Sequence, residues 1–191
     1  LHTGDFKLDR NPAFGEQSDI EKLKALGKEG VLAAMVDSTN IFVEGRSGSE
    51  GDLLESLDNV FAGIKGKLVF GTFSSNAGRL IKVIELAAKH GRKTAIVSRS
   101  AINNYNHAKA CGYVPPHIAA EVIEADQAAN MAGSDVMLLV AGTQGEPNSA
   151  LGGLARGQTV RGHKLGKNDT VLLSCRFIPG NERAIYNMIN L

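Results

Sequence analysis

The chain has 191 residues, of which 43% are hydrophobic and 21% charged, as in an ordinary globular domain. This composition excludes a disordered tail, a collagen-like fibre and a coiled coil, and no apolar run approaches the ~20 residues that cross a bilayer. The net charge of +1, from 21 basic and 20 acidic residues, excludes a uniformly basic surface, so any nucleic-acid contact must rest on local clusters.

Apolar runs and helical periodicities alternate along the chain. Residues 8–20 are expected to form a loop, and five short apolar runs bounded by Gly or Asp predict buried strands at 30–36, 67–73, 93–97, 135–140 and 170–174. Apolar residues at spacings of three and four predict helices at 53–64 and 80–87, the latter stopped by Gly91. Weaker patterns predict helices at 101–111 and 118–131, around the Pro115-Pro116 break, and a last helix at 182–191. The alternation predicts an α/β fold, an open and mostly parallel sheet with helices on both faces.

The chain ends indicate whether the sequence is a piece of a longer protein, and the cysteines indicate its redox compartment. The first residue is Leu1, not Met, and the last predicted helix continues to Leu191, so we expect a piece of a longer protein. Cys111 and Cys175 form no CxxC pair, which excludes a disulfide framework. Without a signal segment or membrane span, a cytoplasmic protein with reduced thiols is expected.

Small polar residues follow each predicted strand. They are the segments 37–40, 74–76, 98–100, 142–146 and 174–176. Such residues also cap helices and form turns. Because the carboxyl ends of parallel strands share one edge, the whole set nevertheless favours an anion-accepting rim.

The step from strand to helix at Ser74, Ser75 and Asn76 is the most specific part of this rim. Free backbone N–H groups at the helix start would face an anion there, and Arg79 could bind a phosphate with two hydrogen bonds. We expect the Gln144-Gly145 loop beside it, with Glu146 turned away or paired with an arginine. The loop lacks the lysine of a P-loop, and no GxGxxG follows a strand.

Metal-ligand spacing is absent. The five histidines show no HxH, HxxxH or HExxH pattern, so the chain cannot complete a zinc site from its own residues. Asp5 lies after a glycine turn, where a carboxylate could either reach a metal or remain solvated.

The chain resembles ribonuclease J, in the β-CASP group of the metallo-β-lactamase superfamily. The resemblance rests on an ordered set of motifs: His2-Thr3-Gly4-Asp5-Phe6-Lys7, Asp37-Ser38-Thr39-Asn40, Gly45-Arg46-Ser47-Gly48-Ser49-Glu50, Thr72-Phe73-Ser74-Ser75-Asn76 with Arg79, Gly91-Arg92-Lys93, Cys111-Gly112-Tyr113, Gly142-Thr143-Gln144-Gly145-Glu146-Pro147 and Ile178-Pro179-Gly180-Asn181-Glu182. It implies a two-zinc nuclease with 5′-to-3′ exonuclease and endonuclease activity in RNA processing and decay.

The resemblance also implies a layout. Residues 1–40 would end the first metallo-β-lactamase segment, 41–175 would form a flavodoxin-like β-CASP domain, and 176–191 would return towards the lactamase domain. Asp5 would bridge the two zinc ions, and Asp37 would be catalytic by partnering a histidine. Ser74, Ser75, Asn76, Arg79, Gln144 and Gly145 would hold the 5′ monophosphate of RNA.

The implied partners are this RNA, the remainder of the protein's own chain and, in the full-length protein, a homodimer or homotetramer, with no membrane. The family's HxHxDH motif and later histidines do not occur in the chain, so we expect it to bind no zinc tightly and to be inactive alone. Residues 114–134 match the family poorly.

Two other functions fit the residues. One is a free-standing flavodoxin-like module that binds a phosphate or nucleotide in a complete pocket. The other is a non-catalytic RNA-binding domain, which would use basic clusters at Lys89, Arg92 and Lys93 and at Arg156, Arg161, His163, Lys164 and Lys167.

Overall fold

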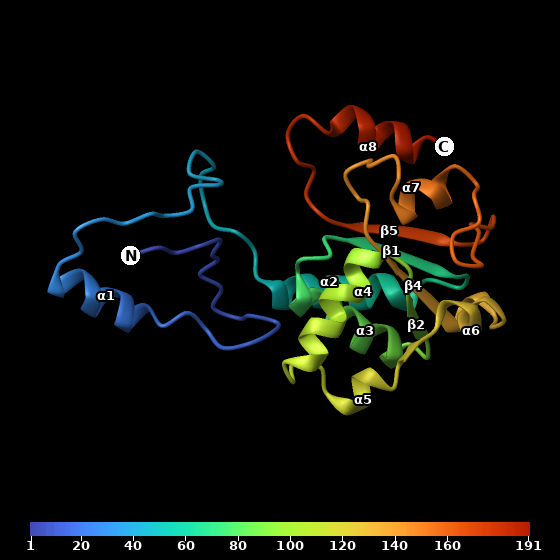
Figure 1. Ribbon diagram of the computed structural model, residues 1–191, viewed down its shortest axis with the longest axis horizontal. Coiled ribbons are helices and arrows are strands. Elements are labelled where there is room, and N and C mark those ends of the chain that lie inside the picture. The colour runs from blue at the N-terminus through green and yellow to red at the C-terminus, as the bar shows by residue number, and fades with distance from the viewer. The chain divides into compact units, whose positions relative to one another are not determined.

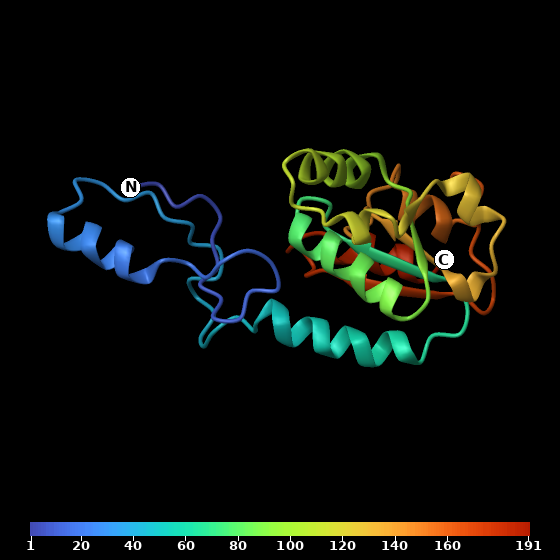
Figure 2. The ribbon, with the colours of Figure 1, turned by 90° about the horizontal axis from the view of Figure 1, so that it is seen from below.

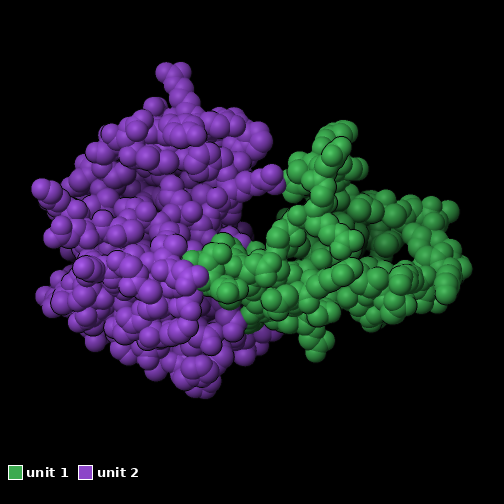
Figure 3. Space-filling model, turned by 180° about the vertical axis from the view of Figure 1, so that it is seen from behind, with its two compact units in different colours: residues 1–56 green, residues 57–191 purple.

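The computed structural model describes all residues from Leu1 to Leu191. The chain divides into two compact units, Leu1–Ser56 and Leu57–Leu191, which Figure 3 colours separately. The elements in chain order are α1 (Ile20–Glu29), α2 (Glu50–Ala62), β1 (Leu68–Thr72), α3 (Ala77–Lys89), β2 (Lys93–Ile96), α4 (Arg99–Ala110), α5 (Pro116–Ala119), β3 (Val122–Ile123), α6 (Ala125–Ala129), the short 3-10 helix η1 (Gly133–Asp135), β4 (Val136–Val140), α7 (Ala150–Ala155), β5 (Thr170–Ser174) and α8 (Glu182–Ile189).

The second unit is built on a five-stranded sheet with the order β3-β2-β4-β1-β5 (Figure 1). Every neighbouring pair of strands is parallel, with Leu68 of β1 opposite Met137 of β4 on one side and Thr170 of β5 on the other. The predicted α/β class and the strands within 67–73, 93–97, 135–140 and 170–174 are therefore confirmed.

Helices cover both faces of this sheet, as the sequence predicts. On one face Val69 and Leu138 join a buried cluster with Leu151 of α7 and Met188 of α8. On the other face Phe70 of β1 meets Phe61 of α2, with ring centroids 6.0 Å apart. Figure 2 shows the C-terminal part of α2, which belongs to the second unit from Leu57 on, at this side of that unit. Because both faces are covered, β1 and β4 are buried along their whole length, which explains their continuous apolar sequences.

The predicted helix at 118–131 is wrong. Pro116 starts a short α5, after which the β-branched residues Val122 and Ile123 pair with β2 as the edge strand β3, and α6 follows. The six-residue helix α7 is a further element that the periodicity does not predict. The helices predicted at 53–64, 80–87, 101–111 and 182–191 are confirmed, with ends shifted by a few residues.

The predicted strand at 30–36 is also wrong. The segment forms only a single parallel bridge, between Met35 and His2, and its Leu32 side chain is fully exposed. An apolar run becomes a buried strand only where neighbouring strands pair with it, and this segment has one short neighbour. The first unit instead contains α1, whose N-cap is Asp19 and which lies just after the predicted loop.

No helix in the structure combines the length and apolar character that a membrane crossing requires.

Candidate functional site

The carboxyl ends of the strands carry the polar loops that the sequence singles out. Because β1, β4, β2 and β5 are parallel, these loops leave the sheet at one edge. The loop after β1 and the loop after β4 follow directly neighbouring strands, as predicted. The edge therefore brings segments 73–76 and 141–146 together.

The loop after β1 starts α3 with Asn76 as its N-cap. The Asn76 Oδ1 atom accepts a hydrogen bond from the backbone N–H of Arg79 at 3.0 Å. Ser74 contributes its backbone carbonyl, which accepts from Asn104 Nδ2 of α4 at 2.8 Å. Neither serine hydroxyl is needed to start the helix, and the Ser75 side chain is exposed.

Arg79 is tied to the end of β5. Its Nη1 atom donates to the carbonyl oxygen of Ser174 at 3.2 Å, and Thr72 Oγ1 donates to the same oxygen at 3.1 Å. These bonds join the ends of β1 and β5. The Arg79 guanidinium thus has a structural role in addition to the phosphate binding that the sequence suggests.

The loop after β4 is held by its own polar side chains. Gln144 is buried; its Oε1 accepts from the Ile178 N–H at 2.9 Å, and its Nε2 donates to the Arg176 carbonyl at 3.0 Å. Glu146 Oε2 accepts from the Gln144 N–H at 2.9 Å, so the expected arginine partner of Glu146 is replaced by this amide. The side chain of Gln144 therefore fixes the segment after β5 to the sheet edge.

Gly145 permits helix α8 to lie against this loop. Its φ of +78° is in the left-handed region, and a Cβ atom there would lie 2.5 Å from the carbonyl carbon of Ala184. A side chain at this position would be both strained and in conflict with α8.

Asp5 and Asp37 lie on two adjacent segments of the first unit. Met35 N–H donates to the Leu1 carbonyl at 2.9 Å, Thr3 N–H to Met35 at 3.0 Å, and Asp37 N–H to Thr3 Oγ1 at 3.1 Å. Asp5 follows the left-handed turn at Gly4 and is exposed. The parallel pairing therefore brings both carboxylate-bearing residues to the same end of the two segments.

The Asp37 carboxylate is oriented by Thr39. Its Oδ1 accepts from Thr39 Oγ1 at 2.6 Å and from the Thr39 N–H at 3.0 Å. These hydrogen bonds, with a smaller one from the Phe6 backbone, lower the pKa of Asp37 against the opposing effect of desolvation. The same hydrogen bonds orient the carboxylate towards Thr39.

No three side chains of His, Cys, Asp or Glu gather anywhere in the structure as a metal site. Asp5 fits zinc as a single oxygen ligand, whereas each zinc ion requires about four ligands. The residues present do not by themselves fit the two zinc ions that the resemblance implies.

Two members of the predicted basic clusters belong to the core. Arg92 is 3% exposed and donates to four backbone carbonyls, including those of Ile64 at 2.6 Å and Gly66 at 2.8 Å. His163 is 2% exposed, with Nε2 at 2.9 Å from the Ala125 carbonyl, and burial lowers the pKa of this imidazole. Each of the two predicted basic clusters therefore contains one residue that cannot lie on its surface.

Arg161 is the residue of this edge that sequence reasoning misplaces. The sequence groups it with the basic run at 156–167, but in the fold it lines the same cavity as Arg99 and Ser100, which follow β2. The only sequence signal is the following Gly162, which marks a tight turn.

Comparison with known proteins identifies relatives along the whole chain. Residues 65–191 match the family model described as Ribonuclease J, beta-CASP domain. The whole chain is 37% identical to Ribonuclease J of Synechocystis sp., of which it covers 29%, and 36% identical to Ribonuclease J of Mycobacterium tuberculosis, of which it covers 34%. It is 34% identical to Ribonuclease J of Helicobacter pylori, of which it covers 27%. The chain spans about a third or less of the length of the curated relatives it matches.

Proposed function

The chain belongs to the ribonuclease J family, and from this membership we propose that it supplies the RNA-binding β-CASP part of a zinc-dependent ribonuclease. In the full-length protein this part binds the 5′-monophosphorylated end of RNA, while the two zinc ions and the remaining catalytic residues are held mainly by the rest of the protein. The protein is then a cytoplasmic phosphodiester hydrolase with 5′-to-3′ exonuclease and endonuclease activity.

The loop after β1 carries this proposal. A phosphate beside it would meet the hydroxyls of Ser74 and Ser75, the Nδ2 donor of Asn76 and the positive end of α3. Since Asn76 Oδ1 caps the helix, the serine hydroxyls are not required for capping. Each charge-assisted hydrogen bond to the phosphate would contribute about 1.5–3 kcal/mol.

The residues at the neighbouring strand ends hold the loop in position, and their side chains are already hydrogen-bonded to the protein. Arg79 links the loop to the end of β5, and Gln144 holds the segment that follows β5. The Gly145 backbone lies between Gln144 and Glu146, without a side chain to obstruct a ligand. We propose that Arg79, Gln144 and Gly145 act on the phosphate chiefly by keeping this edge in shape.

Asp5 and Asp37 are proposed to serve the catalytic centre of the whole protein. Zinc, when bound, would activate water and offset charge on the scissile phosphate. Asp5 would bind the metals through its exposed carboxylate, and Asp37 would orient a histidine from outside this chain. The hydrogen bonds from Thr39 lower the pKa of Asp37 and hold its carboxylate in one orientation, which would suit that task.

The test compares RNA ends in the full-length protein. We expect the double variant Ser74→Ala/Ser75→Ala to lose roughly a hundred-fold or more of its activity on 5′-monophosphorylated RNA, since two phosphate donors are removed. Its activity on the same RNA with a 5′ hydroxyl should change little. Cleavage rates on both substrates provide the measurement.

The control variant is Ser134→Ala, at the opposite end of β4, which should leave both rates unchanged. An undiminished preference for the monophosphate in Ser74→Ala/Ser75→Ala would remove the loop from the proposed site.

A further inference from the structure

One threonine hydroxyl joins the two segments of the first unit that carry Asp5 and Asp37. The Thr3 Oγ1 atom accepts a hydrogen bond from the Asp37 N–H at 3.1 Å and donates one to the Gly4 carbonyl at 2.8 Å. A hydroxyl can donate and accept at the same time, so this single side chain bonds both segments. Thr3 and Asp37 are half-buried, unlike most residues of the first unit.

The turn that carries Asp5 is held at Gly4 from both sides. The Gly4 N–H donates to His2 Nδ1 at 3.0 Å, and the Gly4 carbonyl accepts from the Thr3 hydroxyl. The φ of Gly4 is +59°, a left-handed conformation that glycine adopts without strain. Both polar groups of the Gly4 backbone are therefore bonded to side chains, which fixes the direction in which the chain continues to Asp5.

The Thr3 hydroxyl takes the place of a backbone group at the point where the two segments stop pairing. Met35 N–H donates to the Leu1 carbonyl, and Thr3 N–H donates to the Met35 carbonyl, as in a parallel ladder. The next bond of such a ladder would run from the Asp37 N–H to the Thr3 carbonyl, but this N–H donates to the Thr3 hydroxyl instead. A side chain without a hydroxyl would leave the Asp37 N–H without this partner.

The Asp37 carboxylate makes a second link between the two segments. Hydrogen bonds from Thr39 lower the pKa of Asp37 most, and a hydrogen bond from the backbone of Phe6 lowers it further. Phe6 directly follows Asp5 in the chain. The backbone N–H of Asp37 and its side chain are thus both bonded to the segment that carries Asp5.

We propose that Thr3 is a positioning residue for the reaction of the full-length protein, because its hydroxyl holds Asp37 against the turn that carries Asp5. This inference rests on the proposed function, in which Asp37 orients a histidine. Misplacing a catalytic group by about 1 Å lowers a reaction rate by up to roughly a hundred-fold. Thr3 acts through Asp37 and has no direct role towards RNA in this assignment.

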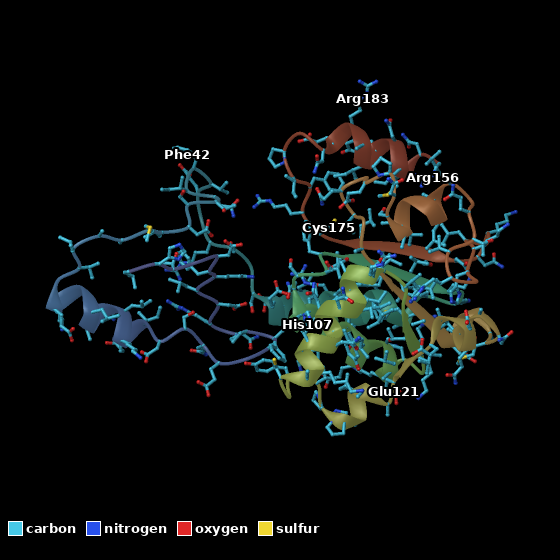
Figure 4. The ribbon with its side chains drawn as sticks, in the orientation of Figure 1. Phe42, His107, Glu121, Arg156, Cys175 and Arg183 are labelled. Atoms are coloured by element: carbon cyan, nitrogen blue, oxygen red, sulfur yellow. The ribbon has the colours of Figure 1, made fainter.

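The first test uses substitutions of Thr3 in the full-length protein. Thr3→Val removes the hydroxyl but keeps the shape of the side chain, so kcat for RNA cleavage should fall roughly ten-fold or more while KM changes little. Thr3→Ser keeps a hydroxyl and should retain most of the wild-type kcat. Thr3→Ala is a second variant without the hydroxyl and should repeat the loss. The matched control is Thr159→Val, since Thr159, three residues after Arg156 in Figure 4, is exposed and its side chain makes no hydrogen bond.

Hydrogen exchange gives a readout that does not depend on catalysis. The Asp37 N–H should exchange slowly in the wild type because it is bonded to Thr3. Thr3→Val and Thr3→Ala should accelerate its exchange roughly ten-fold or more, whereas Thr3→Ser should not. Mass spectrometry of peptides that contain residues 35–39 of the full-length protein measures this exchange.

A double-mutant cycle separates this inference from the proposed function. If Thr3 acts through Asp37, Thr3→Val should lower kcat no further in an Asp37→Ala background. A wild-type kcat in Asp37→Ala would overturn the proposed role of Asp37 itself. A low kcat in Asp37→Ala with a wild-type kcat in Thr3→Val and Thr3→Ala would overturn only this inference. Additive losses in the double variant, an equal loss in Thr159→Val or an unchanged exchange rate of the Asp37 N–H would also overturn it.

Discussion

Individual residues in this protein serve the fold or the site according to where the chain places them. Arg92 and Lys93 are neighbours in sequence, but Arg92 is buried under four backbone carbonyls, whereas Lys93 forms an ion pair with Glu121 at 2.8 Å. Arg99 and Arg161, far apart in sequence, share a cavity. A basic residue type alone therefore does not indicate contact with RNA.

The buried His163 predicts a pH dependence of stability. Its pKa is lowered in the folded state, mainly by burial, so the unfolded chain binds more protons as the pH falls through about 6.5. The free energy of unfolding should therefore decrease between about pH 7.5 and 5.5. Urea unfolding at both values measures this decrease.

The variant His163→Gln should flatten the dependence in that range, because glutamine keeps a donor for the Ala125 carbonyl and does not titrate. Asp58, whose pKa is lowered by hydrogen bonds from Lys89 and then His90, contributes stability that is lost only in more acidic solution, near and below 3.8. An unchanged pH dependence in His163→Gln would assign the effect to other groups.

At the scale of elements, α8 and the loop after β4 depend on one another. Met188 of α8 joins the core, Gln144 bonds the segment that leads into the helix, and Gly145 leaves room for Ala184. The helix is amphipathic, with Ile185 and Met188 buried and Tyr186 and Ile189 exposed. Residues 176–191 therefore belong to the second unit.

The substitution Gly145→Ala tests this dependence. A Cβ atom would combine the cost of a left-handed backbone, about 1–2 kcal/mol, with a conflict against the Ala184 backbone of a further 1–3 kcal/mol. The matched control is Gly157→Ala, where φ is +72° but the space is open, so only the backbone cost is expected. The free energies of unfolding that the two variants lose, measured in denaturant, should differ by at least about 1 kcal/mol. Equal losses would show that α8 moves away from the new Cβ atom at no cost.

At the scale of the molecule, the chain corresponds to only part of the length of its curated relatives. It contains a five-stranded parallel sheet within the region that matches the β-CASP domain, and it spans about a third or less of the length of these relatives. Its first unit supplies Asp5 and Asp37 but no group of three metal ligands. We therefore propose that this chain binds RNA and that most of the metal centre lies elsewhere in the full-length protein.

The variant Asp5→Ala in the full-length protein tests the proposed link to the metals. Because Asp5 is exposed and follows a turn, its loss should change the melting temperature little. Loss of a zinc ligand should lower metal content and reduce RNA cleavage by roughly a hundred-fold or more. Asp19→Asn, which keeps a helix N-cap, is the matched control and should retain wild-type metal and activity. Wild-type values in Asp5→Ala would separate Asp5 from the metal centre.

The fold class, four of the strands, most of the longer helices and the family could all be predicted from the order of the residues alone. These features follow from local periodicity and from short motifs that remain readable without contacts. The order β3-β2-β4-β1-β5, the exposure of segment 30–36 and the split of segment 116–129 depend on which strands find partners. The burial of Arg92 and His163, the hydrogen bonds of Gln144 and the meeting of Arg99 with Arg161 depend on contacts between residues far apart in the chain. Only the tertiary structure decides such contacts, because the packing of the sheet and helices, and not the neighbours in sequence, determines which side chains are desolvated together.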